Sequence, residues 1–293
     1  WLVSPVLTAL ASAIIFSGTR TLVLRHENSY KRVWWMLPLL VYLTTWINVY
    51  FVFTKGVKKT IQGTKDDWTN TKSAWIAACI AAGTSLVSLL TIPLLKRRIA
   101  NRPQLPPPEM SEDPEEVREL KEHFDPDTEH AFSMLQVFSA ICVIFAHGAG
   151  EVGYMAGPLS TIWSVHETHK LSKSIKAPLW IVLYSAASLV IGLAMYGKNV
   201  TYAMGKRLAK LTPSRGFAAE LATSLVILIA TQYGLPTSSS QCITGGVVGI
   251  GLAEGFSHVN WTFFGKTLLS WVMTMFVTGV GTGLLFLQGL AAP

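Results

Sequence analysis

Charged side chains are scarce in this 293-residue chain: Asp, Glu, Lys and Arg make up only 14% of it, against about 25% in soluble domains. Half of the residues are hydrophobic and the mean hydropathy is +0.40. This composition excludes an intrinsically disordered chain and disfavours a soluble globular one. The net charge of +7 comes from basic residues scattered among short polar segments, so nucleic-acid binding is not indicated.

Cysteine is also rare. Cys79, Cys142 and Cys242 lie far apart, each within an apolar run. Their spacing fits neither a disulfide framework nor a zinc site, so we expect three buried thiols. The chain has no HExxH motif and no intramembrane pair of aspartates. We therefore expect a protein that is not an enzyme and has no cofactor.

Seven stretches of 19 or more residues carry no Asp, Glu, Lys or Arg. They are residues 1–19, 33–54, 73–95, 131–150, 177–197, 221–253 and 267–293. About 20 apolar residues in a helix cross a hydrocarbon core of roughly 30 Å. One such stretch could be a signal peptide or a buried helix, but seven cannot. The sequence therefore predicts an all-α, polytopic helical membrane protein.

Two of the uncharged regions contain helix-breaking residues. Residues 221–253 are interrupted by Gly234-Leu235-Pro236 and a hydroxyl cluster that suits a new helix N-terminus. In residues 131–165 we expect a glycine-rich break at 147–153, followed by Gly157-Pro158. Such discontinuous helices are a sequence indicator of a transporter's binding site, because unwound backbone at membrane depth must line a wet cavity or be buried.

The polar segments between the spans indicate an orientation. Segments 20–33, 96–129 and 198–215 together carry 15 Lys and Arg, against 8 in segments 55–72 and 166–176. The positive-inside rule then places the first three on the cytoplasmic side.

Two polar features adjoin the spans on this side. Ten of the 17 acidic residues lie between Glu109 and Glu129. We interpret segment 96–129 as a solvated linker, with a regulatory or partner-binding loop as the alternative. We interpret Lys198 and Asn199, which follow the fifth uncharged stretch, as interfacial anchors rather than ligands.

An internal repeat relates residues 1–16 to residues 271–286, because Trp, Thr and Phe recur at the same offsets. Hydroxyl residues recur in step: Ser4, Thr8 and Ser12 match Thr274, Thr278 and Thr282. A spacing of four puts each trio on one stripe of its helix, as close helix packing in lipid requires.

The repeat predicts a two-repeat organisation. We expect residues 1–95 to be the remainder of a first transmembrane repeat, 96–129 to be the acidic loop, and 130–293 to be a second repeat with the site-forming broken helices. Nothing in this sequence precedes Trp1, so we expect an N-terminally incomplete chain, roughly the last three-fifths of a transporter.

Four motifs together resemble the inorganic phosphate transporter (PiT) family of sodium- or proton-coupled phosphate permeases. They are Trp1-Leu-Val-Ser-Pro5, Phe145-Ala-His-Gly-Ala-Gly-Glu-Val152 with Gly157-Pro158, Gly216-Phe-Ala-Ala-Glu-Leu221 and Gly234-Leu-Pro-Thr-Ser-Ser-Ser-Gln241. The resemblance implies an inverted-repeat transporter fold in which each repeat contributes one GANDV-type and one PVSTT-type element to a shared site. Here Gly150 and Glu151 replace the Asn and Asp of GANDV, and Tyr154 replaces a further Asn.

Phosphate is an anion with several acceptor oxygens, and a helix N-terminus offers free N–H groups and a positive dipole end. We expect the segment after the Gly-Leu-Pro break to bind phosphate through hydroxyl and amide donors. Its residues are Thr237, Ser238, Ser239, Ser240 and Gln241. By resemblance, Ser238 corresponds to the serine of PVSTT. The alternative is that these residues only cap a kinked helix.

Glu151 stands between 20 uncharged residues and 14 more, so a coupling role is the default expectation. It would hold Na⁺ as a metal ligand or carry the coupled proton, with Gly148 and Gly150 of the same motif at the ion site. His147 would pair with Glu151, line the entry, or be purely structural. By resemblance, Glu220 matches the glutamate of the family's GFxxEL motif, which is implicated in transport; otherwise it is a charge at a helix N-terminus.

The leading hypothesis is secondary active transport of inorganic phosphate coupled to Na⁺ or H⁺. One alternative is a transporter of another tetrahedral oxyanion such as sulfate. A second is a truncated, non-transporting relative that acts as a receptor or regulatory subunit. Expected partners are phosphate, the coupling ion and the lipid bilayer, with a homodimer left open and no nucleic acid. The expected location is a multi-pass position in the plasma membrane.

Overall fold

The computed structural model describes residues 2–57, 69–101, 122–170, 172, 175–233, 235 and 237–291. The α-helices of this part are α1 (Val3–Thr19), α2 (Ser29–Phe51), α4 (Asn70–Ala100), α5 (Pro126–Thr168), α6 (Leu179–Gly192), α7 (Lys198–Tyr202), α8 (Pro213–Gln232), α9 (Ser239–Glu254) and α10 (Trp261–Ala291). Four short π-helical segments continue these helices. The segment η1 (Arg20–Leu24) extends α1, and η2 (Val52–Val57) extends α2. The segment η3 (Leu193–Gly197) joins α6 to α7, and η4 (Ala203–Leu208) follows α7. A 3₁₀ turn, η5 (Phe256–His258), precedes α10.

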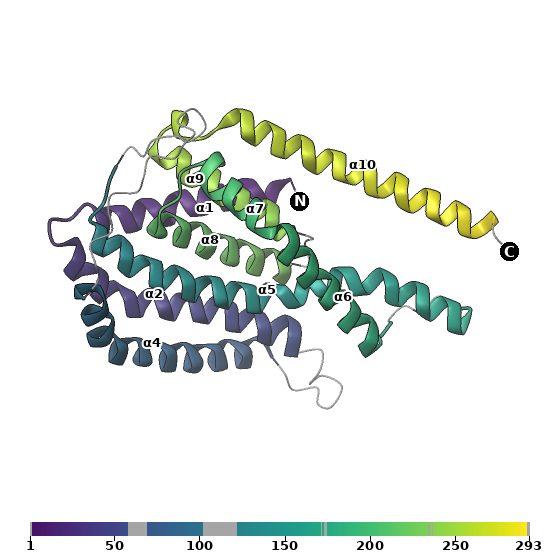
Figure 1. The fold of residues 1–293 in the computed structure, drawn as a ribbon. Helices are drawn as coiled ribbons and strands as arrows, with labels where there is room; N and C mark the ends of the chain where they lie inside the picture. The colour runs from purple at the N-terminus through teal and green to yellow at the C-terminus, as the bar shows by residue number, and fades with distance from the viewer. Residues whose placement is uncertain are drawn as a thin grey trace.

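Seven helical stretches of the described chain are long and apolar enough to cross a membrane, and each overlaps one of the seven uncharged runs. The predicted all-α membrane fold is therefore confirmed. Helices α1, α2, α5, α8 and α9 form the bundle, α4 covers α2, and α10 stands away from the rest (Figure 1). The core side chains come from all five bundle helices and include Phe16, Leu37, Phe132, Phe217 and Ile250.

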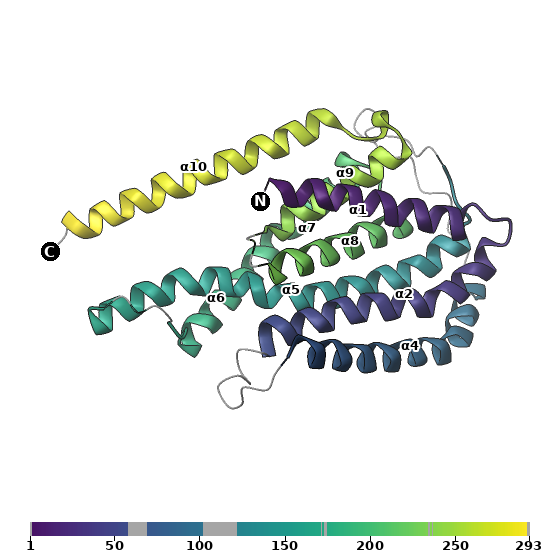
Figure 2. The ribbon, with the colours of Figure 1, turned by 180° about the vertical axis from the view of Figure 1, so that it is seen from behind.

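Helices α1 and α9 run side by side in very close contact (Figure 2). A Cβ added at Gly245 would lie 2.1 Å from the carbonyl oxygen of Pro5, and one at Gly249 would lie 2.0 Å from that of Ala9. The Ser12 hydroxyl donates to the Gly246 carbonyl at 2.8 Å. Glycines spaced by four thus let two backbones approach, which is how helices associate where lipid removes the hydrophobic driving force.

The two hydroxyl trios of the internal repeat have different surroundings. Ser4, Thr8 and Ser12 are buried along α1, so the expected close packing is confirmed there. Helix α10 has no buried residue, and Thr274, Thr278 and Thr282 are exposed. The expected packing is therefore not met for α10 within the described structure.

The predicted break in the chain at residues 147–153 is wrong, because α5 is one continuous helix of 43 residues. Single glycines weaken a helix by only about 1 kcal/mol each, and leaving backbone groups unpaired in lipid costs more. Around Pro158, the Ser160 and Thr161 hydroxyls donate to the carbonyls of Ala156 and Gly157, at 2.6 and 3.0 Å.

Two further expectations need correction. Lys198 and Asn199 do not end a span, because the helix continues without interruption from Leu179 to Leu208. Of the three cysteines only Cys242 is buried, whereas Cys79 is exposed and Cys142 is intermediate. Cys79 lies on α4, which packs on the bundle with one face and leaves the other open to lipid.

Candidate functional site

Helices α8 and α9 form a hairpin whose two open ends lie together. Arg215, in the first turn of α8, pairs with Glu254, the last residue of α9, and Arg215 Nε donates to Glu254 Oε1 at 2.9 Å. The helices are therefore antiparallel, and the connection at 233–238 lies at the far end. The predicted break after residue 232 is confirmed, although Gly234 and Pro236 themselves fall outside the described residues.

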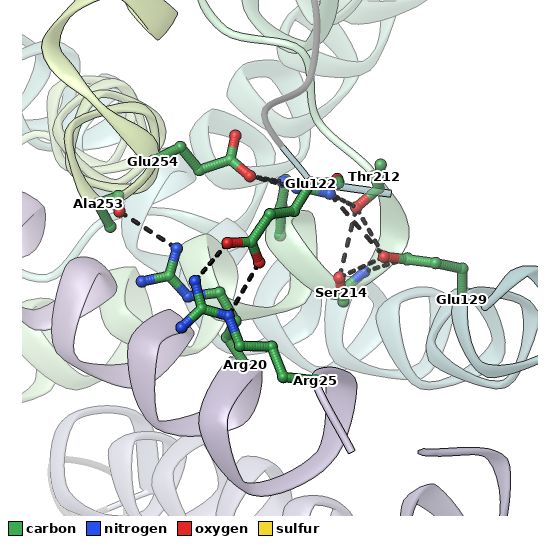
Figure 3. A network of polar contacts seen from close by, with 9 residues as sticks. Arg20, Arg25, Glu122, Glu129, Thr212, Ser214, Ala253 and Glu254 are labelled. Atoms are coloured by element: carbon green, nitrogen blue, oxygen red, sulfur yellow. Dashed lines mark hydrogen bonds and ion pairs between the residues drawn. The ribbon is translucent and has the colours of Figure 1, made fainter. Parts of the chain in front are cut away.

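A polar network holds the open end of the hairpin. Besides Glu254, the buried Arg215 donates to the Thr212 hydroxyl at 2.8 Å and the Glu122 carbonyl at 3.0 Å. Glu129 of α5 accepts bonds from the Ser214 backbone N–H and hydroxyl, at 3.0 and 2.6 Å (Figure 3). A carboxylate thus satisfies one of the free N–H groups at the N-terminus of α8. Sequence spacing offered no signal for this network, because Arg215 and Glu254 are 39 positions apart.

The same end collects the segments that the charge count placed on one side. Arg20 donates to the Ala253 carbonyl at 3.3 Å, and Arg25 pairs with Glu122 (Figure 3). The hydrogen bond from Glu122 raises the pKa of the Arg25 guanidinium above its ordinary value. The common side of these segments is confirmed for the described residues. Its assignment to the cytoplasm stays a prediction, and residues 102–121 of the acidic loop lie outside the described part.

At the far end of the hairpin, the N-terminus of α9 meets α5. Ser238 caps α9, because its hydroxyl accepts from the Gln241 N–H at 3.5 Å. The next residue, Ser239, donates its hydroxyl to the Glu151 carboxylate at 2.5 Å. The structure thus brings together a predicted phosphate-binding serine and the predicted coupling carboxylate, which are 88 positions apart. Thr237, Ser238 and Gln241 are half-buried beside this contact, and Ser240 is exposed.

The other residues expected near Glu151 take different positions. His147 does not pair with Glu151; it is 8% exposed, and its ring lies 4.7 Å from that of Phe51. Gly148 and Gly150 lie within the continuous α5, where a Cβ would meet nothing within 4 Å. Since α5 does not unwind there, its carbonyls are engaged in the helix, and Glu151 is the side chain of this motif that offers an ion ligand.

A cavity of about 1220 Å³ opens between α8, α9, α10 and the helix that contains α7. Glu220 and Ser240 line it, together with Gln136 of α5. Gly216, the first residue of the GFxxEL motif, makes room for that glutamine: a Cβ there would lie 2.1 Å from Gln136 Nε2. Glu220 Oε2 is buried and has no hydrogen-bond partner among the described residues.

The predicted site residues therefore fall in two adjoining places. Ser239 faces Glu151, and Ser240 faces the cavity with Glu220. Successive residues of a helix point about 100° apart, so the N-terminus of α9 serves both places at once. In the described chain no group of three His, Cys, Asp or Glu side chains could hold a metal ion together. A single carboxylate flanked by hydroxyls offers oxygen ligands of the kind that hard cations take.

A polytopic helical protein in which the tip of a helical hairpin presents hydroxyls to a carboxylate of a neighbouring helix is organised like a membrane transporter. Residues 1–282 match the model of the phosphate transporter family, so the chain belongs to that family. The expected resemblance to the PiT family is thereby confirmed.

Individual relatives agree with this assignment. The chain is 37% identical over 179 residues to the phosphate-repressible phosphate permease pho-4 of Neurospora crassa, covering 60% of this chain and 30% of that protein. It is 35% identical over 164 residues to the sodium-dependent phosphate transporter 1 of Homo sapiens, covering 55% of this chain and 24% of that protein. A solved structure, "The sodium-dependent phosphate transporter", superposes with a TM-score of 0.70 at 25% identity over 93% of this chain and 60% of its own. The chain thus spans about a third or less of these two curated relatives.

Proposed function

We propose that the protein carries inorganic phosphate across a membrane by secondary active transport coupled to Na⁺. The observation that carries this proposal is the contact between Ser239, at the N-terminus of α9, and Glu151 of α5. It joins an anion-binding helix end to a carboxylate inside a candidate membrane span. The names of the relatives, which include phosphate permeases and sodium-dependent phosphate transporters, support the same substrate and ion.

The geometry suggests why the two solutes move together. Phosphate held by the N–H groups and hydroxyls of residues 237–241 would lie beside the Glu151 carboxylate, and the two negative charges repel strongly in a medium of low dielectric constant. A cation bound to Glu151 removes this repulsion. Phosphate and cation therefore each favour binding of the other, as thermodynamic linkage requires. A proton on Glu151 would serve the same purpose, which makes H⁺ the alternative coupling ion.

The hairpin supplies an element that can move. Its open end is held by the Arg215–Glu254 pair, whereas its tip contacts α5 through the Ser239–Glu151 hydrogen bond. We propose that the tip shifts against α5 as the site opens to one side and then the other. In this proposal residues 1–95 and 130–293 belong to two repeats joined by the segment 96–129. We place the protein in the plasma membrane, and the homodimer stays part of the proposal.

The test is uptake of radiolabelled phosphate by cells that express the protein, with the Na⁺ gradient and the external pH varied separately. We expect uptake that requires Na⁺ and is inhibited by arsenate but not by sulfate. Uptake driven by a pH gradient without Na⁺ would reassign the coupling ion. Inhibition by sulfate as strong as that by arsenate would reassign the substrate, and no phosphate uptake above that of cells without the protein would refute the proposal.

A further inference from the structure

Lys198 is a lysine inside a candidate membrane span. The helix that contains it runs from Leu179 to Leu208, and Lys198 lies ten residues before its end. At 1.5 Å per residue, this places its backbone about 15 Å from that end of the helix. The whole helix has 30 residues and is about 45 Å long, which exceeds a hydrocarbon core of roughly 30 Å. What marks Lys198 is therefore the cavity that it lines, and not its distance from the helix end.

The helix is irregular on both sides of this lysine. The π-helical segments η3 and η4 flank α7, which begins at Lys198. π-Helical turns are rare and occur frequently at functional sites, because each one costs regular hydrogen bonding and persists where it positions a side chain. The irregularity therefore coincides with the lysine that lines the cavity.

Lys198 faces the cavity described above and not only lipid. Two more cations, Lys206 and Arg207, line this cavity near the end of the helix, against one described acidic lining residue, Glu220. Ser240 lies at the other end of α9 from Glu254, about 21 Å away along that helix. Cations thus follow one wall of the cavity from the open end of the hairpin inward, and Lys198 is the deepest of them.

We infer that this cavity is the path by which a phosphate oxyanion reaches the N-terminus of α9, and that Lys198 attracts and selects the anion on the way. This inference rests on the proposed transport function and adds a residue to it. A lysine ammonium acts as a compact point charge toward phosphate. In a cavity walled by protein and lipid its attraction for a dianion is far less screened than in water. Removing the charge therefore weakens phosphate binding, whereas any other cation at this position keeps it.

The test compares phosphate uptake by Lys198→Gln, Lys198→Arg and Lys31→Gln at equal surface expression. Lys31 makes a matched control, since it is an exposed lysine in the first turn of α2 and does not line the cavity. We expect the glutamine variant at 198 to raise KM for phosphate about tenfold or more, the arginine variant to stay within about threefold of the parent, and Lys31→Gln to leave KM unchanged. A parent-like KM in Lys198→Gln overturns the inference while leaving the transport proposal intact. Absence of uptake in the parent protein refutes the transport proposal instead.

A chemical rescue keeps the test decisive if Lys198→Gln fails to fold. Lys198→Cys is prepared in a background in which Cys79, Cys142 and Cys242 are alanine. Aminoethyl methanethiosulfonate forms a disulfide with this cysteine and restores a positive charge close to the lysine position. Methyl methanethiosulfonate forms the same kind of disulfide but adds a neutral group. We expect the first reagent to lower KM back toward the parent value and the second to leave it raised. Equal effects of the two reagents overturn the role of the charge.

The same cysteine distinguishes free phosphate from a lipid headgroup, which presents the same oxygens. In nanodiscs of zwitterionic lipid, we expect inorganic phosphate to slow the modification of Lys198→Cys at least about threefold. Modification that responds to added anionic lipid but not to inorganic phosphate would assign the cavity to a headgroup, and this would overturn the inference.

Discussion

The Arg215–Glu254 pair at the open end of the hairpin is the contact on which the placement of α9 depends most directly. Both side chains are buried, with 1% and 4% exposed, and Arg215 also lies over the rings of Phe16 and Phe124 at 5.4 and 5.0 Å. Replacing Arg215 by leucine leaves the Glu254 carboxylate buried without its cation. Breaking a buried pair by removing one partner costs about 3–5 kcal/mol.

The double variant separates the pair from its surroundings. Arg215→Leu with Glu254→Leu removes both charges, so no uncompensated ion remains, and such replacements are often nearly neutral. We therefore expect the double variant to be more stable than Arg215→Leu alone, with a coupling free energy of about 2 kcal/mol or more. Additive destabilisation by the two substitutions would refute the reasoning.

The assay is the midpoint of thermal unfolding of the purified protein in detergent. Each kcal/mol shifts the midpoint by about 2–4 °C in chains of a few hundred residues, so Arg215→Leu should lower it by roughly 10 °C. Arg25→Leu is the control, because it removes an arginine whose side chain is 51% exposed in its pair with Glu122. We expect this control to leave the midpoint unchanged.

Three further predictions concern the tip of the hairpin and the α1–α9 contact. Glu151→Gln should abolish the dependence of phosphate uptake on Na⁺, because the neutral amide no longer repels phosphate when the cation is absent; Na⁺ titration of uptake checks this, and an unchanged titration contradicts it. Ser239→Ala should raise KM for phosphate at least about tenfold, since a hydrogen bond to a charged group is worth roughly 1.5–3 kcal/mol; kinetics with a parent-like KM would count against the site. Gly249→Ala should destabilise the protein by about 1–3 kcal/mol, because the added methyl group overpacks against Ala9. Thermal unfolding measures this loss. Gly83→Ala is the control and should not destabilise the protein, since a Cβ at Gly83 meets nothing within 4 Å.

Much of the fold follows from where charge is absent. The seven uncharged runs correspond to seven helical stretches able to cross a membrane. The break after residue 232 was predictable too, because Gly234, Pro236 and a run of hydroxyls combine a helix stop with a helix start. The glycines at 148, 150 and 153 misled the same reasoning, since glycine alone permits a break without requiring one, and α5 continues through them.

The candidate site was predictable only in parts. The sequence marks Glu151 and the serines at 238–240 as polar residues in apolar surroundings, but no spacing rule brings Glu151 to Ser239 across 88 positions. The end of the uncharged run at Gly197 does not mark the end of the helix that contains Lys198. Its helix continues for ten more residues to Leu208, and this continuation makes Lys198, Lys206 and Arg207 part of one wall of the cavity.

The sequence by itself determined that this protein lies in a lipid bilayer, and it determined how many candidate membrane spans the chain has. The reason is that hydrocarbon excludes charge and that each crossing needs about 20 apolar residues in a helix. It also determined which polar residues would be costly in that bilayer. Tertiary structure alone decided which of them meet: the antiparallel return of α9 along α8 joins Arg215 to Glu254 at one end and presents Ser239 to Glu151 at the other. The physical reason is that helix packing depends on side chains distant in sequence, which no local pattern encodes.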